Sequence, residues 1–367
     1  MRAAATAPAA GGTGGSDAHP AAGDGFSFTA DDVTELKKLV NGIPSSNSDS
    51  ADAAGVRDLE GTGNNIAHPD YASADQPFIR ITNAHYGAPD GNGNLSVNPI
   101  FSGLDPRTIS NILGTQEADL AKNAAGANIF FMAFGQYIDH GLDFLPKGGN
   151  GSIAIGSGVD NPADLTRGTV AGYEDGVPQH NNKASPFVDQ NQAYGSTELV
   201  GQLLRQGDSD GGVGARLLAG GVDPSNPDFR LLPTLRELIE HHWANNTVFT
   251  HDSLPGGSAS FRSYYPDLVG SNGVINAAMV VGLNSDFMGS GHTLVGDSNP
   301  FVNILDHFVA GDLRANENYA LTSIHTIWAR NHNYHVDKLV AAGFEGTAEE
   351  LFQAAKIVNE AEYQRVV

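Results

Sequence analysis

The apolar positions of this chain recur mostly three and four residues apart, which is the spacing of an amphipathic helix. The helices that this pattern predicts run over residues 29–42, 106–115, 124–138, 197–206, 232–244, 300–309, 321–342 and 347–366. Alternating apolar positions are rare, and only Phe78–Thr82 predicts a strand. The pattern indicates a mainly α fold with long irregular loops. Loops of that length in a compact domain usually carry function.

Residues 1–55 differ in composition from the rest of the chain. They are rich in Ala, Gly, Pro, Ser and Asp, which is typical of disordered or low-complexity sequence. The exception is a short helix near residues 29–42, for which Thr29 is the predicted N-cap. We therefore expect one domain over residues 56–367, which is long enough to bury a full core.

The two ends of the chain lack the usual signals. The helix predicted over residues 347–366 meets no Gly, Pro or polar stop before Val367, so we expect a chain truncated at its C-terminus. Met1 is not followed by the apolar core of a signal peptide. No run of about 18 apolar residues occurs, and we expect no transmembrane helix.

Composition excludes several classes of function. The 42 acidic and 20 basic residues give a formal charge of −22, which argues against nucleic acids and anionic membranes as partners. The charge suits cation binding, but an ordinary acidic soluble protein explains it equally well. The chain has no cysteine. Thiolate catalysis, Cys-ligated zinc or iron–sulfur centres, and disulfides are therefore excluded.

The segment Phe134–Phe144 places four polar side chains in an otherwise apolar stretch. They are Gln136, Asp139, His140 and Asp143. An imidazole buried beside carboxylates costs free energy unless each group is paired or used. On a helix, Gln136 and His140 share one face, and the two aspartates share an adjacent face. A lone Asp-His pair is most often a polar cluster that satisfies itself, but the full pattern is much more specific.

Two further segments carry candidate chemistry. In the loop from Ser185 to Asn191, alternate residues offer side-chain oxygens or, at Phe187, a main-chain carbonyl, and Ca²⁺ takes six to eight oxygen ligands. Many ordinary loops show the same alternation. Arg314 and Glu317 are three residues apart near the start of a predicted helix. An isolated pair of this kind is usually a local ion pair.

Together, these segments resemble the animal haem peroxidase (peroxidase–cyclooxygenase) superfamily. The collinear motifs are Gly61–Asn65, Asp105–Asn111, Phe134–Phe144, Ser185–Ser196, Gly311–Asn333 and Ala361–Gln364. Five or six motifs in the same order make a chance resemblance improbable. The resemblance implies a haem-peroxidase-like helical domain. The absence of cysteine and the Gly-rich loops favour a bacterial member.

The resemblance also implies roles for individual residues. His140 would take a proton from hydrogen peroxide and return it to the leaving oxygen, and Arg314 would stabilise the negative charge on that oxygen. Gln136 would orient a distal water or a halide. The implied cofactor is haem b, and Asp139 and Glu317 match the two acids that form ester links to it. The sulfonium link of some members needs a methionine where this chain has Asn318, so we exclude it.

A calcium site is implied as well. Its expected ligands are Gly141, Ser185, Phe187, Asp189 and Asn191. Gly141 stands where the animal enzymes carry aspartate, so it offers only its carbonyl. Asp143 is the candidate substitute.

The histidine that binds the other face of haem is not found by motif. Gly291–Leu294 looks like the family's proximal motif, but it precedes Arg314, whereas the family's proximal histidine follows that arginine. We expect a downstream segment to complete the haem site. Activity of this chain alone is uncertain for that reason.

The remaining histidines suggest a metal only at first sight. His325, His332 and His335 lie on one predicted helix, but no carboxylate lies at the spacing of a zinc protease. We interpret them as packed or hydrogen-bonded. Glu237–His242 lacks that spacing too.

Three functions stay open. The leading one is a peroxidase that reduces hydrogen peroxide with a small-molecule electron donor, in an extracellular or cell-surface setting. A fatty-acid dioxygenase of the same superfamily is the near alternative. The third is a surface or binding protein that keeps the fold without catalysis. Gly141 and the missing haem ligand favour it, whereas the intact set around His140 and Arg314 does not.

Overall fold

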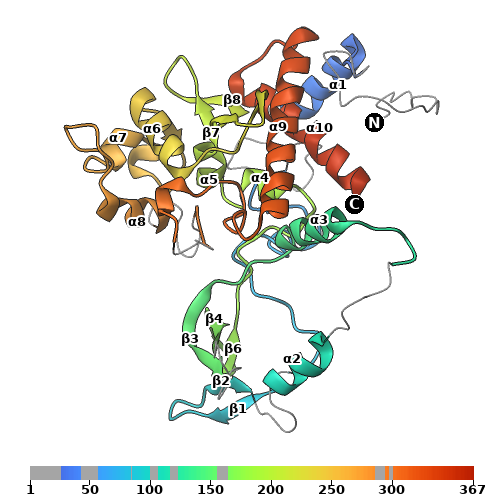
Figure 1. Cartoon of the computed structure of the whole chain (residues 1–367), viewed down its shortest axis with the longest axis vertical. Helices are drawn as coiled ribbons and strands as arrows, with labels where there is room; N and C mark the ends of the chain where they lie inside the picture. The colour runs from blue at the N-terminus through green and yellow to red at the C-terminus, as the bar shows by residue number, and fades with distance from the viewer. Residues whose placement is uncertain are drawn as a thin grey trace.

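The computed structural model describes residues 26–42, 57–83, 85–99, 106–115, 123–154, 164–285, 294–296 and 301–367 (Figure 1). Its α-helices are α1 (Ala30–Asn41), α2 (Pro106–Gly114), α3 (Ile129–His140), α4 (Asn191–Tyr194), α5 (Glu198–Leu203), α6 (Leu235–Asn245), α7 (Phe261–Tyr264), α8 (Ala277–Ser285), α9 (Tyr319–Ala341) and α10 (Ala348–Val366). Two 3-10 turns are η1 (Pro255–Gly257) and η2 (Ile304–Asp306). The mainly α fold is confirmed.

The strands of the described residues are short and pair only within six antiparallel two-stranded sheets. The pairs are β1 (Tyr86–Pro89) with β2 (Leu95–Pro99), β3 (Lys147–Ala154) with β4 (Asp164–Gly168), β5 (Gly172–Glu174) with β6 (Val177–Gln179), β7 (Arg205–Gly207) with β8 (Val213–Leu217), β9 (Val222–Asp223) with β10 (Asn226–Arg230), and β11 (Val248–Thr250) with β12 (Ser258–Ser260). Such isolated hairpins need packing against other elements for their stability.

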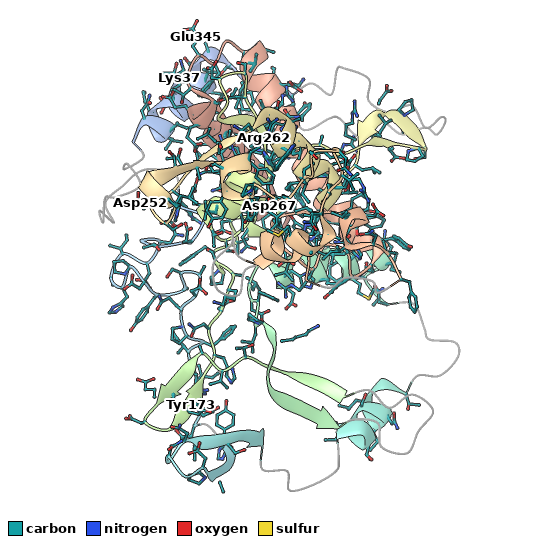
Figure 2. All side chains as sticks on the ribbon, turned by 90° about the vertical axis from the view of Figure 1, so that its left-hand side faces the viewer. Lys37, Tyr173, Asp252, Arg262, Asp267 and Glu345 are labelled. Carbon is teal, nitrogen blue, oxygen red and sulfur yellow. The ribbon has the colours of Figure 1, made fainter. Side chains whose placement is uncertain are left out.

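The molecule has a helical body and an arm. In Figure 1 the body contains α1 and α4 to α10, and α2 and the first strands form an arm on the other side of α3. Figure 2 shows Lys37 and Glu345 at the far end of the body and Tyr173 in the arm. None of the helices in the described ranges has the length and apolarity that crossing a membrane requires.

Most predicted helices are confirmed, with shifted ends. Thr29 caps α1 through a reciprocal pair of hydrogen bonds with Asp32. The helix predicted from residue 124 begins only at Ile129, where Asn128 provides the cap. The helix predicted to residue 206 ends at Leu203, because the chain then enters β7. The helix α8 was not predicted, and the low-complexity prediction for residues 1–25 and 43–55 lies outside the described residues.

Two predictions of secondary structure were wrong. Phe78–Thr82 is not a strand: Ile79 and Ile81 face solvent, and only Pro77 forms a bridge, to Asn181. Residues 301–309 hold only the short turn η2, since Phe308 is extended and bridges to Thr234. Backbone pairing with the segment before α6 thus replaces the predicted helix.

Two packing clusters fix the long C-terminal helices. Val33, Leu36 and Val40 of α1 pack on α9 and α10, so α1 is part of the folded body. Ala133 and Tyr137 of α3 pack against a cluster from the same two helices, namely Leu321, Ile324, Trp328 and Tyr363. Burial of large side chains contributes about 1.5–3 kcal/mol each. This second cluster sets the rotation of α3, and with it the face that the predicted site residues occupy.

Candidate functional site

Gln136 and His140 lie on one face of α3, as predicted, and both approach the carboxylate of Glu317. The Nε2 of Gln136 donates to Glu317 Oε2 at 2.5 Å, and the Nε2 of His140 lies 3.5 Å from the same oxygen. Asn318 Nδ2 donates to Gln136 Oε1 at 2.8 Å, so both ends of the Gln136 amide are held. Residues 181 positions apart in sequence therefore form one polar cluster.

The start of α9 positions Glu317 in this cluster. Asn318 is the N-cap of that helix, and its side-chain oxygen accepts from the Leu321 amide at 2.9 Å. A helix N-terminus favours a nearby negative charge. The Glu317 side chain is 29% exposed, so the carboxylate remains reachable from outside.

Arg314 lies behind His140, at the C-terminal end of α3. Its Nη2 donates to the carbonyls of His140 at 2.9 Å and Asp143 at 2.7 Å. Burial disfavours the guanidinium charge, but hydrogen bonds and the negative charge of Asp312 outweigh it and raise the pKa of Arg314. Cations are favoured at helix C-termini, so the guanidinium also stabilises the end of α3.

Asp312 is a site residue that the sequence analysis missed. Its carboxylate accepts from Arg314 Nε at 3.0 Å and from Arg314 Nη2 at 2.7 Å. Its Oδ1 also lies 3.6 Å from His140 Nδ1, so His140 is flanked by Asp312 on one side and Glu317 on the other. Asp312 lies inside the motif Gly311–Asn318, but nothing in the motif marks it as a neighbour of His140. A Cβ at Gly311 would lie 2.2 Å from the Asn191 carbonyl, which shows how closely this backbone packs.

Asp139 and Asp143 lie apart from the cluster. Asp139 is exposed on α3, and Asp143 follows the end of the helix, with its side chain 56% exposed. Burial, followed by the negative charge of Asp139, raises the pKa of Asp143, and Arg314 opposes this shift. The negative charge of Asp139 therefore acts on the carboxyl group of Asp143.

The five residues expected to bind calcium come together around the loop from Ser185 to Asn191. Asn191 Nδ2 donates to the carbonyls of Gly141, at 2.9 Å, and Ser185. Ser185 Oγ donates to Asp189 Oδ2 at 2.8 Å. Protein donors therefore already bind oxygens that the metal would need.

The chemistry of this set does not fit calcium. Asp189 is the single carboxylate among the five residues, whereas calcium sites of useful affinity use several. Arg57 Nη1 donates to the Phe187 carbonyl at 3.2 Å, which places a positive charge at an expected ligand. The carboxylate of Asp143, the candidate substitute, lies 4.0 Å from Arg314 Nη1, so it too has a positive charge beside it. Within the described residues, no group of three or more His, Asp or Glu side chains could hold a metal ion.

The histidines of α9 are hydrogen-bonded and buried, as predicted. His325 Nδ1 lies 3.1 Å from the Gln192 carbonyl, and His332 contacts the Tyr194 hydroxyl and the Ala215 carbonyl. Burial lowers the pKa of His325 to about 4 and that of His332 to about 3, so both are neutral at pH 7. His335 Nε2 lies 2.9 Å from Glu362.

The Glu237–His242 segment is structural too. Glu237 caps α6 together with Thr234, and His242 is fully buried, with ring contacts to the Leu203 carbonyl and Thr247. The segment Gly291–Leu294, which looks like the family's proximal motif, lies outside the described residues except for Leu294.

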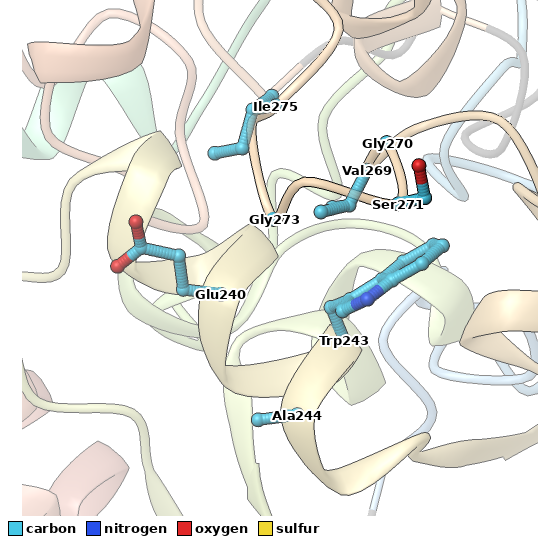
Figure 3. Close-up of a pocket in the computed structure, with 8 residues that line it drawn as sticks. All are labelled: Glu240, Trp243, Ala244, Val269, Gly270, Ser271, Gly273 and Ile275. Atoms are coloured by element: carbon cyan, nitrogen blue, oxygen red, sulfur yellow. The ribbon is translucent and has the colours of Figure 1, made fainter.

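A surface cleft of about 440 Å³ lies between α6 and the loop of residues 269–275 (Figure 3). The indole of Trp243 forms one wall, and Glu240 contributes its carboxylate at the edge. None of the residues of the His140 cluster lines it. The cleft is therefore separate from the candidate site.

A family model and two curated relatives match this chain. The family model described as animal haem peroxidase matches residues 56–237 and 290–367. The chain is 27% identical to thyroid peroxidase of Homo sapiens over 242 residues, which are 64% of this chain and 23% of that protein. It is 36% identical to peroxidasin of Drosophila melanogaster over 64 residues, 17% of this chain and 4% of that protein.

A solved structure shares the fold. Peroxidase A from Dictyostelium discoideum matches with a TM-score of 0.56 at 19% sequence identity, over 85% of this chain and 51% of that one. The chain thus spans about half of that protein and less than a quarter of the two curated relatives. Because the family model covers more than half of the residues, the chain belongs to the animal haem peroxidase family.

Proposed function

We propose that this chain carries the distal side of a haem peroxidase site, which reduces hydrogen peroxide while a small-molecule donor is oxidised. The observation that supports it best is the position of His140. The imidazole is 5% exposed and lies between the carboxylates of Asp312 and Glu317, with Arg314 fixed behind it. A merely structural histidine does not require two acids and an arginine around it.

Glu317 of the cluster and Asp139 outside it have the chemistry that haem would need at its edge. Glu317 and Asp139 are carboxylates that solvent reaches, and they are the candidates for ester links to the haem edge. The first turn of α3 exposes Ile129 and Met132 on the side of the helix that carries Gln136 and His140, which gives an apolar surface that an aromatic macrocycle can cover. When bound, haem supplies the redox chemistry that splits the O–O bond of peroxide.

His140 is the proposed acid and base. Its imidazole would take a proton from one oxygen of hydrogen peroxide and deliver it to the other oxygen, which leaves as water. A proton on Nδ1 would face Asp312, 3.6 Å away, and one on Nε2 would face Glu317, 3.5 Å away. The two acids can therefore stabilise the imidazolium that this transfer creates.

Arg314 and Gln136 would support the transfer. The guanidinium of Arg314 stays charged because Asp312 holds it, and a fixed positive charge in a partly buried site stabilises negative charge on a leaving oxygen. Gln136 is held by Glu317 and Asn318, so its amide can orient a water or halide without losing rotamer entropy.

The test is haem reconstitution followed by peroxide kinetics. After the purified chain is mixed with haemin, with and without imidazole in solution, we expect haem to co-elute with the protein on gel filtration and to show a Soret band shifted from that of the same mixture without protein. Replacing His140 by Ala should keep that band and slow the reaction with peroxide by about 10²–10⁴-fold.

The control is His251→Ala, a histidine whose ring nitrogen contacts Ser253 outside the cluster. No protein-bound Soret band, with or without imidazole, would count against haem binding and favour a protein that keeps the fold without catalysis. A band with unchanged kinetics in His140→Ala would remove His140 from the mechanism.

A further inference from the structure

The loop from Ser185 to Asn191 is held from the side by α10. Asn359 Nδ2 donates to Gln190 Oε1 at 2.7 Å, and Gln364 Nε2 donates to the Val188 carbonyl at 3.0 Å. Val188 and Gln190 have φ values of 54° and 57°, a left-handed conformation that is costly for residues other than glycine. The two strained residues of the loop are thus the two that α10 binds.

A buried ammonium group lies in the same interface. Lys356 of α10 is 1% exposed, and its Nζ lies 2.6 Å from Glu360 Oε1 and 5.7 Å from the centre of the Tyr194 ring. A buried lysine is rare unless it is paired. Here it is paired within α10 and lies near Tyr194, the last residue of α4, which begins where the loop ends.

Positive side chains offset part of the buried negative charge around the loop. Asp189 and Glu360 are 4% and 8% exposed, and burial raises the pKa of both carboxyl groups. In each case the positive charge of Lys356 opposes the shift. Asp58 contributes a further negative charge that acts on Asp189, and Arg57 contributes a positive one on Glu360.

The end of α3 is adapted to the same arrangement. A Cβ at Gly141 would lie 2.2 Å from Gln192 Nε2, so the side chain of Gln192 fills the place of an aspartate at position 141. Gln192 Nε2 donates to the Tyr137 carbonyl at 2.7 Å and to the Tyr363 hydroxyl of α10 at 3.1 Å. Gln192 thus occupies the space of an aspartate side chain at position 141 and also donates a hydrogen bond to α10.

We propose that this loop is closed without calcium, because Lys356 and Arg57 supply the positive charge and α10 supplies the hydrogen bonds that a metal site would otherwise provide. The ammonium of Lys356 pairs with Glu360 and offsets part of the negative charge of Asp189, and Arg57 binds the Phe187 carbonyl. Asn191, the last residue of the loop, donates to the Gly141 carbonyl, so the closed loop also fixes the end of α3 next to His140. The inference does not depend on haem binding.

Calcium binding by the purified 367-residue chain tests the proposal directly. After dialysis against a chelator, we expect no stoichiometric heat on titration with CaCl₂, and the same melting temperature in EGTA and in millimolar Ca²⁺. A ligand present far above its Kd would raise the melting temperature by several degrees. Such a rise, or a one-to-one binding isotherm, would overturn the proposal.

The role of Lys356 is tested by Lys356→Met, with Lys38→Met as the control. Lys38 also pairs with a glutamate on its own helix, Glu35, but its side chain is 66% exposed. We expect a clearly lower melting temperature for Lys356→Met and none or almost none of that loss for Lys38→Met. Equal melting temperatures would overturn the proposed role.

A second variant covers the case in which Lys356→Met does not fold. Lys356→Met combined with Glu360→Gln removes the paired acid along with the lysine, so no buried charge is left alone in α10. Asp189 then lacks its main cation. A melting temperature below that of Lys38→Met supports the proposal, and one equal to it overturns it.

Discussion

Arg314 is held by the carboxylate of Asp312, two residues earlier in the chain. Arg314 Nε lies 3.0 Å from Asp312 Oδ1, and Nη2 lies 2.7 Å from Oδ2. The Asp312 side chain is buried, at 6% exposed, and the Arg314 side chain is mostly buried, at 11% exposed. The same carboxylate lies 3.6 Å from His140, so one aspartate links the arginine and the histidine of the proposed site.

Replacing Asp312 by Ala should lower the free energy of unfolding by about 3–5 kcal/mol, because it leaves the buried guanidinium without its counter-charge. Chemical denaturation monitored by fluorescence measures the change. The control is Asp337→Ala, which breaks the exposed pair of Asp337 with Arg216 and should cost less than about 1 kcal/mol. Similar losses in both variants would show that the Asp312 pair is no stronger than a surface one.

The pairing of distant segments could be predicted from sequence, whereas Asp312 could not. Gln136 and Glu317 were assigned to one site by resemblance, and the structure joins them by a hydrogen bond. The position of Asp312 depends on the close packing of Gly311 against the Asn191 carbonyl, which no local pattern encodes.

The limits of the fold prediction have a similar cause. The capped helices α1 and α10 were found because Thr29 and Thr347 leave local signatures. The six hairpins were missed because strands such as β3 are rich in glycine and carry little alternation of apolar residues. Residues 300–309 were predicted to be helical, but Phe308 pairs with Thr234 before α6. Tertiary contacts outweigh the local pattern there.

A methyl group at position 141 should be costly. Gly141→Ala forces Gln192 aside and disturbs its bonds to Tyr137 and Tyr363, so we expect a loss of about 1–3 kcal/mol in stability. The control is Gly135→Ala in the same helix, where a Cβ would meet nothing within 4 Å. That change should be neutral or stabilise by up to about 1 kcal/mol. Denaturant midpoints of the two variants decide: a Gly141→Ala as stable as Gly135→Ala contradicts the close contact.

The proposed ester links can be separated by variants of their acids. If peroxide treatment of the reconstituted chain attaches haem covalently, Glu317→Gln and Asp139→Asn should each lower the fraction of haem that stays on the polypeptide during extraction with acidified organic solvent. Asp143→Asn is the matched control, because Asp143 lies beside Asp139 but follows the helix. Mass spectrometry of the polypeptide measures the attached haem. Complete extraction from the unmodified chain would contradict both links.

The stability of the protein should depend on the protonation of Glu60. Burial and the negative charge of Glu198 raise the pKa of Glu60 from 4.5 to about 7. The hydrogen bond from the Glu198 amide acts in the opposite direction. The folded protein therefore keeps the Glu60 proton up to about pH 7, while the unfolded chain releases it near pH 4.5. The unfolded state binds fewer protons in this window, so the Glu60 contribution to stability falls as the pH rises through it.

Glu60→Gln removes this dependence, and its amide oxygen can still accept from Glu198. Relative to the unmodified protein, the variant should gain about 2 kcal/mol of unfolding free energy between pH 4 and pH 8, a value reduced for the partial exposure of the side chain. Denaturation curves at the two pH values measure the gain. The exposed Glu345→Gln should show no such gain (Figure 2). If the difference between Glu60→Gln and the unmodified protein is the same at both pH values, the proton on Glu60 is not retained in the folded state.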